Sequence, residues 1–168
     1  FISSRKARGV TGSSNPIGDY FYFDFAAHEM GHQFGANHSF NGDDGSCAGD
    51  NRNDATAVEP GSGSTLMAYA GLCSSQNVQS KTDLYFHTIS IDEIWTNITS
   101  GSGSCATESN LILNNNAPIA NAGADFTIPI GTAYVLEGAG SDSDGDPISF
   151  AWEQIDNEIT VVPPSSNA

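Results

Sequence analysis

One short segment has the residue types and the spacing of a metal site. Residues 28 to 38 read His-Glu-Met-Gly-His-Gln-Phe-Gly-Ala-Asn-His. Positions four apart share a face of a helix, so His28 and His32 can present two imidazole nitrogens to one ion. Gly35 can adopt positive φ and end the helix, which allows His38 to supply a third ligand from beyond it. Three imidazoles leave the fourth position of a tetrahedral zinc ion open for water, as is typical of a catalytic site.

Glu29 is the residue of this segment that could act as a general base. It lies about 100° around the helix from His28, so its carboxylate can reach a metal-bound water without replacing a ligand. Zinc lowers the pKa of bound water to about 7, and Glu29 would move its proton to the leaving amine while hydroxide attacks a peptide carbonyl. The alternative, for the shorter H-E-x-x-H pattern alone, is an accidental pair of surface histidines.

The full pattern H-E-x-x-H-x-x-G-x-x-H resembles the signature of the metzincin zinc metallopeptidases, in which a Met-turn follows. Residues 65–69, Thr-Leu-Met-Ala-Tyr, are the candidate for that turn. The resemblance implies that Met67 lies beneath the three histidines and that Tyr69 touches the metal or steadies the oxyanion. The alternatives are that Met67 is an ordinary core residue and that Tyr69 is a packed aromatic side chain with a locally bonded hydroxyl.

Within the metzincins, the Asn37-His38 pair and the sequence Ala-Gly-Leu-Cys at residues 70–73 resemble reprolysin-like peptidases of secreted bacterial proteins. That branch commonly has Asp after the third histidine, whereas this chain has Ser39. The resemblance also implies that residues just after Met67 form a wall of the pocket for the side chain that follows the cleaved bond.

Fewer than thirty residues precede His28, whereas metzincin catalytic domains place a twisted sheet and a helix before the zinc helix. The resemblance covers Phe1 to about Ser100, and so implies the rear part of a catalytic domain. We therefore expect these 168 residues alone to cleave poorly and full activity to belong to a longer parent chain.

The chain is strongly acidic, with five Lys and Arg against twenty Asp and Glu and a formal net charge of −15. Such a charge repels nucleic acids and anionic membranes, so no nucleic-acid partner is expected. No apolar run approaches the ~20 residues of a membrane-spanning helix, so no membrane insertion is expected. The lack of a signal pattern does not argue against export in a chain that begins at Phe1. The resemblance favours a secreted, extracellular protein.

The three cysteines, Cys47, Cys73 and Cys105, form no C-x-x-C pair of the kind found in cysteine zinc sites or redox motifs. In a secreted protein we favour a disulfide between Cys47 and Cys73. Cys105 would then have its partner in the upstream chain, and other pairings remain open.

The elements that position the motif can be predicted from local patterns. Residues 1–19 are polar and rich in turn residues, which predicts a short strand and a loop. A helix over residues 25–34, with Asp24 as its N-cap, would carry the first histidine in its opening turns. Residues 41–64 are dense in Gly, Asp, Asn and Ser and predict a long irregular loop.

Apolar residues at helical spacing predict a second helix over residues 90–98, with Ser90 as its cap and Asp92 and Glu93 in its first turn. His87 lies outside the motif and beside aromatic residues, so a structural role is expected for it.

Beyond a linker rich in Ser, Gly and Asn, short apolar runs separated by turn residues indicate antiparallel β structure. These runs are Phe126–Ile130, Ala133–Glu137 and Ile148–Gln154. The stretch from Asn116 to Gln154 resembles Ig-like modules of the polycystic-kidney-disease or cadherin-like type. Roughly fifty residues are too few for a sandwich of about a hundred, so the chain is expected to stop inside this module.

The expected fold is α+β, with the C-terminal part of a metzincin catalytic domain followed by a partial antiparallel β-sandwich. The predicted domains are a peptidase region at 1–104, whose N-terminal sheet subdomain is largely missing, a linker at 105–116 and an Ig-like module at 117–168. Carboxylates in the turn at 142–146 and in the long loop are candidate calcium ligands, with an acidic solvated surface as the alternative. They are Asp142, Asp144, Asp146, Asp43, Asp44, Asp50 and Asp54.

The expected function is zinc-dependent hydrolysis of internal peptide bonds of extracellular proteins, with a β-module that binds a polymer or surface. The rival is a non-catalytic secreted adhesion protein in which the metal is structural. Replacing Glu29 with Gln separates them, because catalysis needs the base and metal binding does not.

Overall fold

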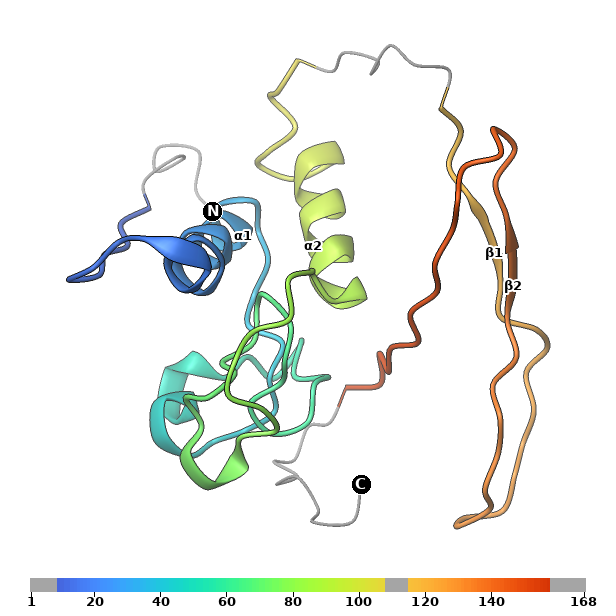
Figure 1. The fold of residues 1–168 in the computed structure, drawn as a ribbon, viewed down its shortest axis with the longest axis horizontal. Helices are drawn as coiled ribbons and strands as arrows, with labels where there is room; N and C mark the ends of the chain where they lie inside the picture. Colours follow the sequence, from blue (N-terminus) through green and yellow to red (C-terminus); the bar gives the residue numbers. More distant parts are fainter. Residues whose placement is uncertain (1–8, 108–114, 158–168) are drawn as a thin grey trace. The chain divides into compact units, whose positions relative to one another are not determined.

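The computed structural model describes residues 9–107 and 115–157. Of these, residues 9–107 with 153–157 belong to one compact unit and residues 115–152 to a second. The fold is α+β, and the described residues form two α-helices and one two-stranded antiparallel sheet (Figure 1). Within the described ranges, neither helix has the length and apolar character needed to cross a bilayer.

The helix that carries the first two histidines begins earlier than predicted. α1 (His28–Gln33) directly continues a π-helical segment, η2 (Tyr20–Ala27), so Asp24 lies inside the helical run and is not its N-cap. Tyr20 packs on Phe25 with ring centroids 5.1 Å apart, and five residues correspond to about one π-helical turn. The predicted start was wrong because this aromatic packing extends the helix upstream, and His28 therefore lies well inside it.

The segment before this helix has no strand in residues 9–19. The predicted polar, turn-rich loop is confirmed for residues 9–17, whereas residues 18 and 19 are already helical and the predicted strand is absent from residues 9–19. The first part of the predicted strand and loop, residues 1–8, lies outside the described residues.

The second helix, α2 (Thr88–Thr99), also begins earlier than predicted, and its N-cap is His87 instead of Ser90. The buried ring of His87 accepts a hydrogen bond at Nδ1 from the backbone N–H of Ile89 at 3.2 Å. This cap satisfies one of the free N–H groups of the first turn, so the structural role expected for His87 is confirmed. Because the helix starts at Thr88, Asp92 and Glu93 both lie beyond its first turn, and their predicted place was wrong.

The long loop is irregular, as predicted, apart from two short 3₁₀ turns, η3 (Gly45–Cys47) and η4 (Gly49–Asn51), and an isolated bridge at Glu59. The loop nevertheless contributes Cys47 to the small core of this unit. The buried members of this core are Phe40, Cys47, Ala68 and Cys73, with Tyr69 packed against them. The loop is therefore anchored on the segment that follows it.

A disulfide joins Cys47 of η3 to Cys73, which directly precedes the 3₁₀ turn η5 (Ser74–Gln76). The predicted pairing is confirmed, with Cα atoms 5.1 Å apart and a sequence separation of 26. Closing a loop of this length stabilises the fold by roughly 3 kcal/mol in the chain-entropy treatment. Cys105 is exposed.

The second unit contains two short strands, β1 (Ile119–Asn121) and β2 (Ala139–Ser141). They pair antiparallel, with Ile119 opposite Ser141. Antiparallel pairing agrees with the prediction, but none of the three predicted runs is a strand. An alternating pattern predicts an extended chain with one covered face, whereas the apolar residues of these runs are largely exposed in the described residues. They include Phe126, Ile130, Val135 and Phe150.

Candidate metal centre

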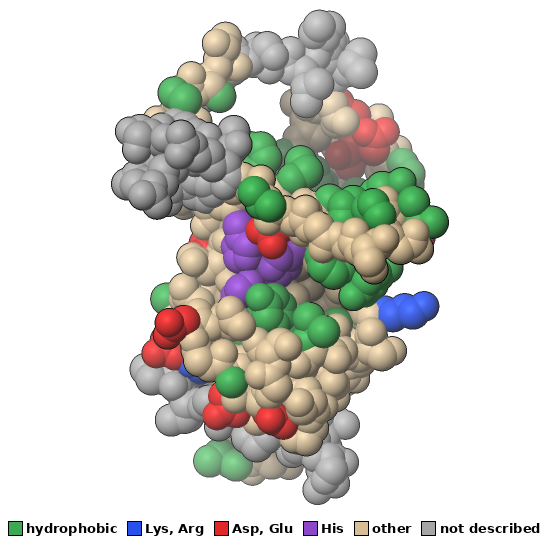
Figure 2. Space-filling view, turned by 90° about the vertical axis from the view of Figure 1, so that its left-hand side faces the viewer, with side chains coloured by type: hydrophobic (Ala, Val, Ile, Leu, Met, Phe, Trp, Pro, Cys, Tyr) green, Lys and Arg blue, Asp and Glu red, His purple; other side chains and the backbone are tan. Residues whose placement is uncertain are grey.

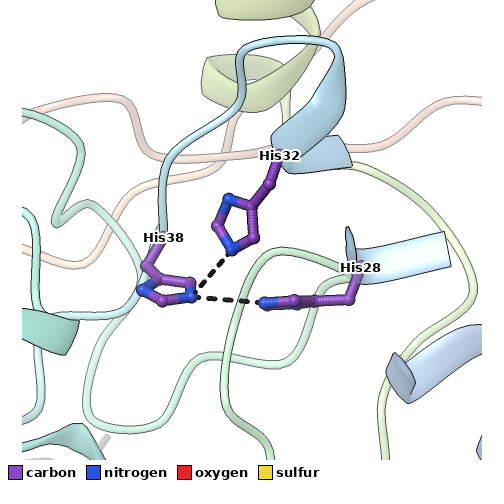
Figure 3. A group of neighbouring side chains, drawn as sticks. All are labelled: His28, His32 and His38. Atoms are coloured by element: carbon purple, nitrogen blue, oxygen red, sulfur yellow. Dashed lines mark hydrogen bonds between the residues drawn. The ribbon is translucent and has the colours of Figure 1, made fainter. Parts of the chain in front are cut away.

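The structure brings the three predicted ligands together (Figure 3). His28 and His32 project from α1, and His38 approaches them from the segment beyond it. The Nε2 atom of His38 lies 3.2 Å from that of His28 and 3.1 Å from that of His32. One ligand atom from each of the three residues lies within 4.8 Å of the other two. Three rings from two segments therefore converge on one point.

The outer nitrogen of each ring is held by a backbone carbonyl. The pairs are His28 with Leu66 at 2.7 Å, His32 with Ala36 at 2.8 Å and His38 with Asn51 at 2.5 Å. A carbonyl oxygen only accepts hydrogen bonds, so each Nδ1 carries a proton. In a neutral imidazole this leaves Nε2 with a bare lone pair, and all three Nε2 atoms face inward. Such carbonyl partners fix the tautomer and orientation of metal-ligating histidines.

Burial keeps two of these rings neutral. It lowers the pKa of His28 to about 4, against an opposing effect of the Leu66 carbonyl, and His32 and His38 lower it further. Burial likewise lowers the pKa of His38 to about 4. Bare nitrogens this close repel one another unless a cation lies between them. Tetrahedral zinc with Zn–N bonds of about 2.0 to 2.1 Å separates its nitrogen ligands by about 3.3 Å, so this donor set is compatible with zinc.

The glycine bend that delivers the third histidine is present. Gly35 has φ +106°, and two hydrogen bonds close the end of α1, from Gly35 N to His32 O at 3.1 Å and from Ala36 N to Gly31 O at 3.0 Å. This pair of bonds is a Schellman motif, which favours glycine at the reversing position. A Cβ at residue 35 would also lie 2.9 Å from the Cβ of Asn97 on α2. Conformation and close packing therefore both require glycine here.

Replacing Gly35 with Ala is expected to destabilise the unit by about 1 to 3 kcal/mol, because a side chain is strained at this φ and collides with Asn97. Denaturant unfolding of the purified chain measures the change. The matched control is Gly12→Ala, since a Cβ at residue 12 would meet no atom within 4 Å. Equal unfolding midpoints for the two variants would contradict the expectation.

Met67 packs against the helical turn between the two histidines of α1. Its side chain is fully buried, and a Cβ at Gly31 would overlap its Sδ atom and lie 3.0 Å from Cε1 of Phe86. The backbone carbonyl of Met67 accepts a hydrogen bond from Ser39 N at 3.1 Å. The turn at 65–69 is thus joined both to α1 and to the residue after His38.

Glu29, Tyr69 and His28 line an open cavity of about 290 Å³. The ring of Tyr69 stands 4.6 Å from that of His38 and 5.7 Å from that of His28, centroid to centroid. Burial raises the pKa of the Tyr69 hydroxyl, and the negative charge of Glu29 raises it further. Tyr69 therefore stays protonated and can donate a hydrogen bond. Figure 2 shows histidine side chains reaching the surface in one patch, with acidic and hydrophobic side chains at its border.

Residues 2–96 match the family model described as Metallo-peptidase family M12B, Reprolysin-like. The chain belongs to this family. The match covers more than half of the chain and includes the three histidines, Glu29 and Met67. Members of a peptidase family act on proteins or peptides. No curated protein and no solved structure matches this M12B family member.

In this metallopeptidase, carboxylates proposed for calcium already have protein partners. Asp44 accepts hydrogen bonds from Ser75, and Asp54 forms an ion pair with Arg52. Asp142 accepts from the backbone in its own turn. In residues 9–107 and 115–157, the histidine cluster is the one group of three or more His, Cys, Asp or Glu with atoms close enough to share an ion. Calcium stays a prediction.

Two carboxylates of the metallopeptidase contact the residues on either side of His38, and neither contact was predicted from the sequence. Glu59 accepts a hydrogen bond from Ser39 Oγ at 2.6 Å, and Glu93 accepts one from Asn37 N at 2.8 Å. The one available signal for Glu59 was its position as a lone acidic residue between small and apolar neighbours. The backbone carbonyls that hold the histidine rings could not be predicted from residue type, because every residue has a backbone carbonyl. They belong to Leu66, Ala36 and Asn51.

Proposed function

We propose that the chain is the zinc-binding core of a secreted metalloendopeptidase of the metzincin type. In this proposal His28, His32 and His38 bind zinc and Glu29 is the general base. The observation that carries it is the convergence of three Nε2 atoms beside the cavity that Glu29 lines. Gly35 supplies the turn and Met67 the apolar floor of the Met-turn, as the metzincin resemblance implies.

Zinc, when bound, supplies a Lewis acid that polarises a peptide carbonyl and lowers the pKa of water. Glu29 would then accept a proton from the attacking water and donate it to the amine that leaves. Tyr69 would donate a hydrogen bond to the carbonyl oxygen as it gains negative charge, a role that its protonated hydroxyl allows. The three carbonyl partners of the histidines would keep the ligands oriented throughout.

We further propose that the cavity receives the substrate side chain that follows the cleaved bond. Its wall includes residues just after Met67, as the resemblance implies, namely Ala68, Tyr69, Ala70 and Leu72. Small residues at two of these positions leave room for a sizeable side chain.

An extracellular setting is part of the proposal. The disulfide between Cys47 and Cys73 supports it, because such bonds persist in oxidising compartments. The second unit would be part of an Ig-like β-sandwich that binds a polymer or surface, as in secreted bacterial enzymes. The exposed apolar side chains of its described residues support this, because a second sheet packed on them would bury them.

Metal content tests the proposal directly. The purified chain is expected to contain a single zinc ion by elemental analysis, because it offers one set of three converging imidazoles. In its natural full-length form the protein is expected to cleave a protein substrate, and a zinc chelator is expected to abolish the cleavage. Added zinc should restore it.

Two results would contradict this proposal. A chain without zinc after purification and zinc addition would remove the metal centre. A zinc-loaded protein without chelator-sensitive proteolysis would favour the adhesion protein with a structural metal.

A further inference from the structure

Glu59 is a buried carboxylate at the centre of a hydrogen-bond network next to the histidines. The residue is 6% exposed, and each of its two side-chain oxygens accepts two hydrogen bonds. The four donors are Ser39 Oγ at 2.6 Å and Thr65 Oγ1 at 2.5 Å to Oε1, and Ser64 N at 2.8 Å and Thr65 N at 3.1 Å to Oε2. No Lys or Arg of the described residues forms an ion pair with Glu59.

This network joins the segment that carries His38 to the turn whose carbonyl orients His28. Ser39 directly follows His38. Thr65 directly precedes Leu66, whose carbonyl accepts a hydrogen bond from the ring of His28. One carboxylate therefore fixes the chain beside the third ligand and the turn that orients the first.

Backbone hydrogen bonds reinforce the same connection. The N–H of Glu59 donates to the carbonyl of Ser39 at 2.9 Å, and the carbonyl of Glu59 accepts from Asn41 N at 2.8 Å. Phe40 and Glu59 also form an isolated parallel bridge. The segment after His38 is thus held by main chain and side chain together.

His38 needs such support more than the other two ligands. His28 and His32 are fixed by the hydrogen bonds of α1, whereas His38 lies in an irregular segment. On its other side, Asn37 N donates to Glu93 at 2.8 Å. The Glu93 contact is exposed and the Glu59 contacts to the side chains of Ser39 and Thr65 are buried, so Glu59 is the stronger of the two constraints.

We propose that Glu59 is a positioning residue of the metal centre, which aligns His38 and the carbonyl partner of His28 and thereby sets the affinity for zinc. This inference rests on the proposed function, in which these histidines bind zinc. Glu59 itself is not near enough to be grouped with the ligands, so it acts through Ser39 and Thr65.

Glu59→Ala is expected to weaken zinc binding by about 10- to 100-fold, the range usual for the loss of a partner that orients metal ligands. The measurement is competition for zinc against a chromophoric chelator, at a temperature where the variant is folded. The absorption spectrum of the cobalt-loaded chain is expected to change as well, since it reports ligand geometry. Glu59→Asp, which keeps the charge but is one methylene shorter, should weaken binding to a smaller extent and serves if Glu59→Ala does not fold.

The matched control is Val58→Ala. Val58 is a buried neighbour that makes no side-chain bond to either segment, so its truncation should lower the thermal midpoint and leave zinc affinity and the cobalt spectrum unchanged. Wild-type zinc affinity in both Glu59 variants would overturn the inference and leave the proposed function intact. If the wild-type chain binds no zinc, both this inference and the proposed function are wrong. A fall in affinity for the Glu59 variants that Val58→Ala does not share would establish the positioning role.

Discussion

Replacing Glu29 with Gln is expected to lower kcat/KM for a peptide substrate by about 10²- to 10⁴-fold while zinc content stays at the wild-type level. The amide has nearly the same shape as the carboxylate, so the cavity beside His28 and Tyr69 is preserved. It cannot accept and return a proton, so the step that needs a base is lost. Steady-state kinetics of the full-length protein, with elemental analysis of the same sample, checks both halves of the expectation.

The control for this variant is Asp92→Asn on the exposed surface of α2, which makes the same chemical change and removes the same charge. It should leave kcat/KM and zinc content unaltered. Undiminished turnover in the Glu29 variant would show that another group carries the proton. Loss of zinc along with activity would instead mean that Glu29 supports the metal centre, and the kinetic result could then not be assigned to a base.

The metal centre could be predicted in its main features because they are local. His28 and His32 are four residues apart on one helix, so their convergence follows from helical geometry. Gly35 was predicted to reverse the chain, and the structure gives it a positive φ and a closed helix end. His38 is only three residues further on, which leaves few ways to place it elsewhere.

The parts that could not be predicted depend on contacts between distant residues. Glu59 reaches Ser39 across 20 positions, and Asn37 and Glu93 are 56 positions apart. Neither pair has a spacing that a helix or strand would repeat. Such partners become visible only when the loop is folded.

Both helix starts were placed too late for related reasons. Asp24 and Ser90 are favourable cap residues by type, but neither lies at the first free N–H groups. Packing of Tyr20 on Phe25 extends the first helix, and His87 provides the cap of α2. In each case a local contact that favours an earlier start outweighed the preference of Asp24 or Ser90 for the cap position.

The strands of the second unit were misplaced because alternation was treated as the main signal. β1 and β2 have the sequences Ile-Ala-Asn and Ala-Gly-Ser, which are too short and too small to stand out. The runs that alternate have no ladder partners in the described residues. Alternation indicates a face to be covered, and it does not specify which segments pair.

Removal of the third predicted ligand, His38, should strongly weaken zinc binding. His38→Ala is expected to weaken zinc binding by roughly 10²-fold or more. A zinc site with four ligands contributes about 10 to 16 kcal/mol, so each ligand accounts for about 2.5 to 4 kcal/mol. Competition with a chelator measures the affinity, and proteolysis should fall to the level of the chelated protein.

His87→Ala is the matched control, because it deletes the same side chain from a buried position away from the cluster. It should destabilise α2 by about 1 kcal/mol through the lost cap and leave zinc affinity unchanged. If His38→Ala retained wild-type affinity, the ion would have to be held by other residues, and the convergence of three Nε2 atoms would lose its functional meaning. If His38→Ala loses zinc and His87→Ala does not, zinc binding depends on a ligand outside the helix. The glycine bend at Gly35 and the network around Glu59 then serve the same purpose, because both position His38.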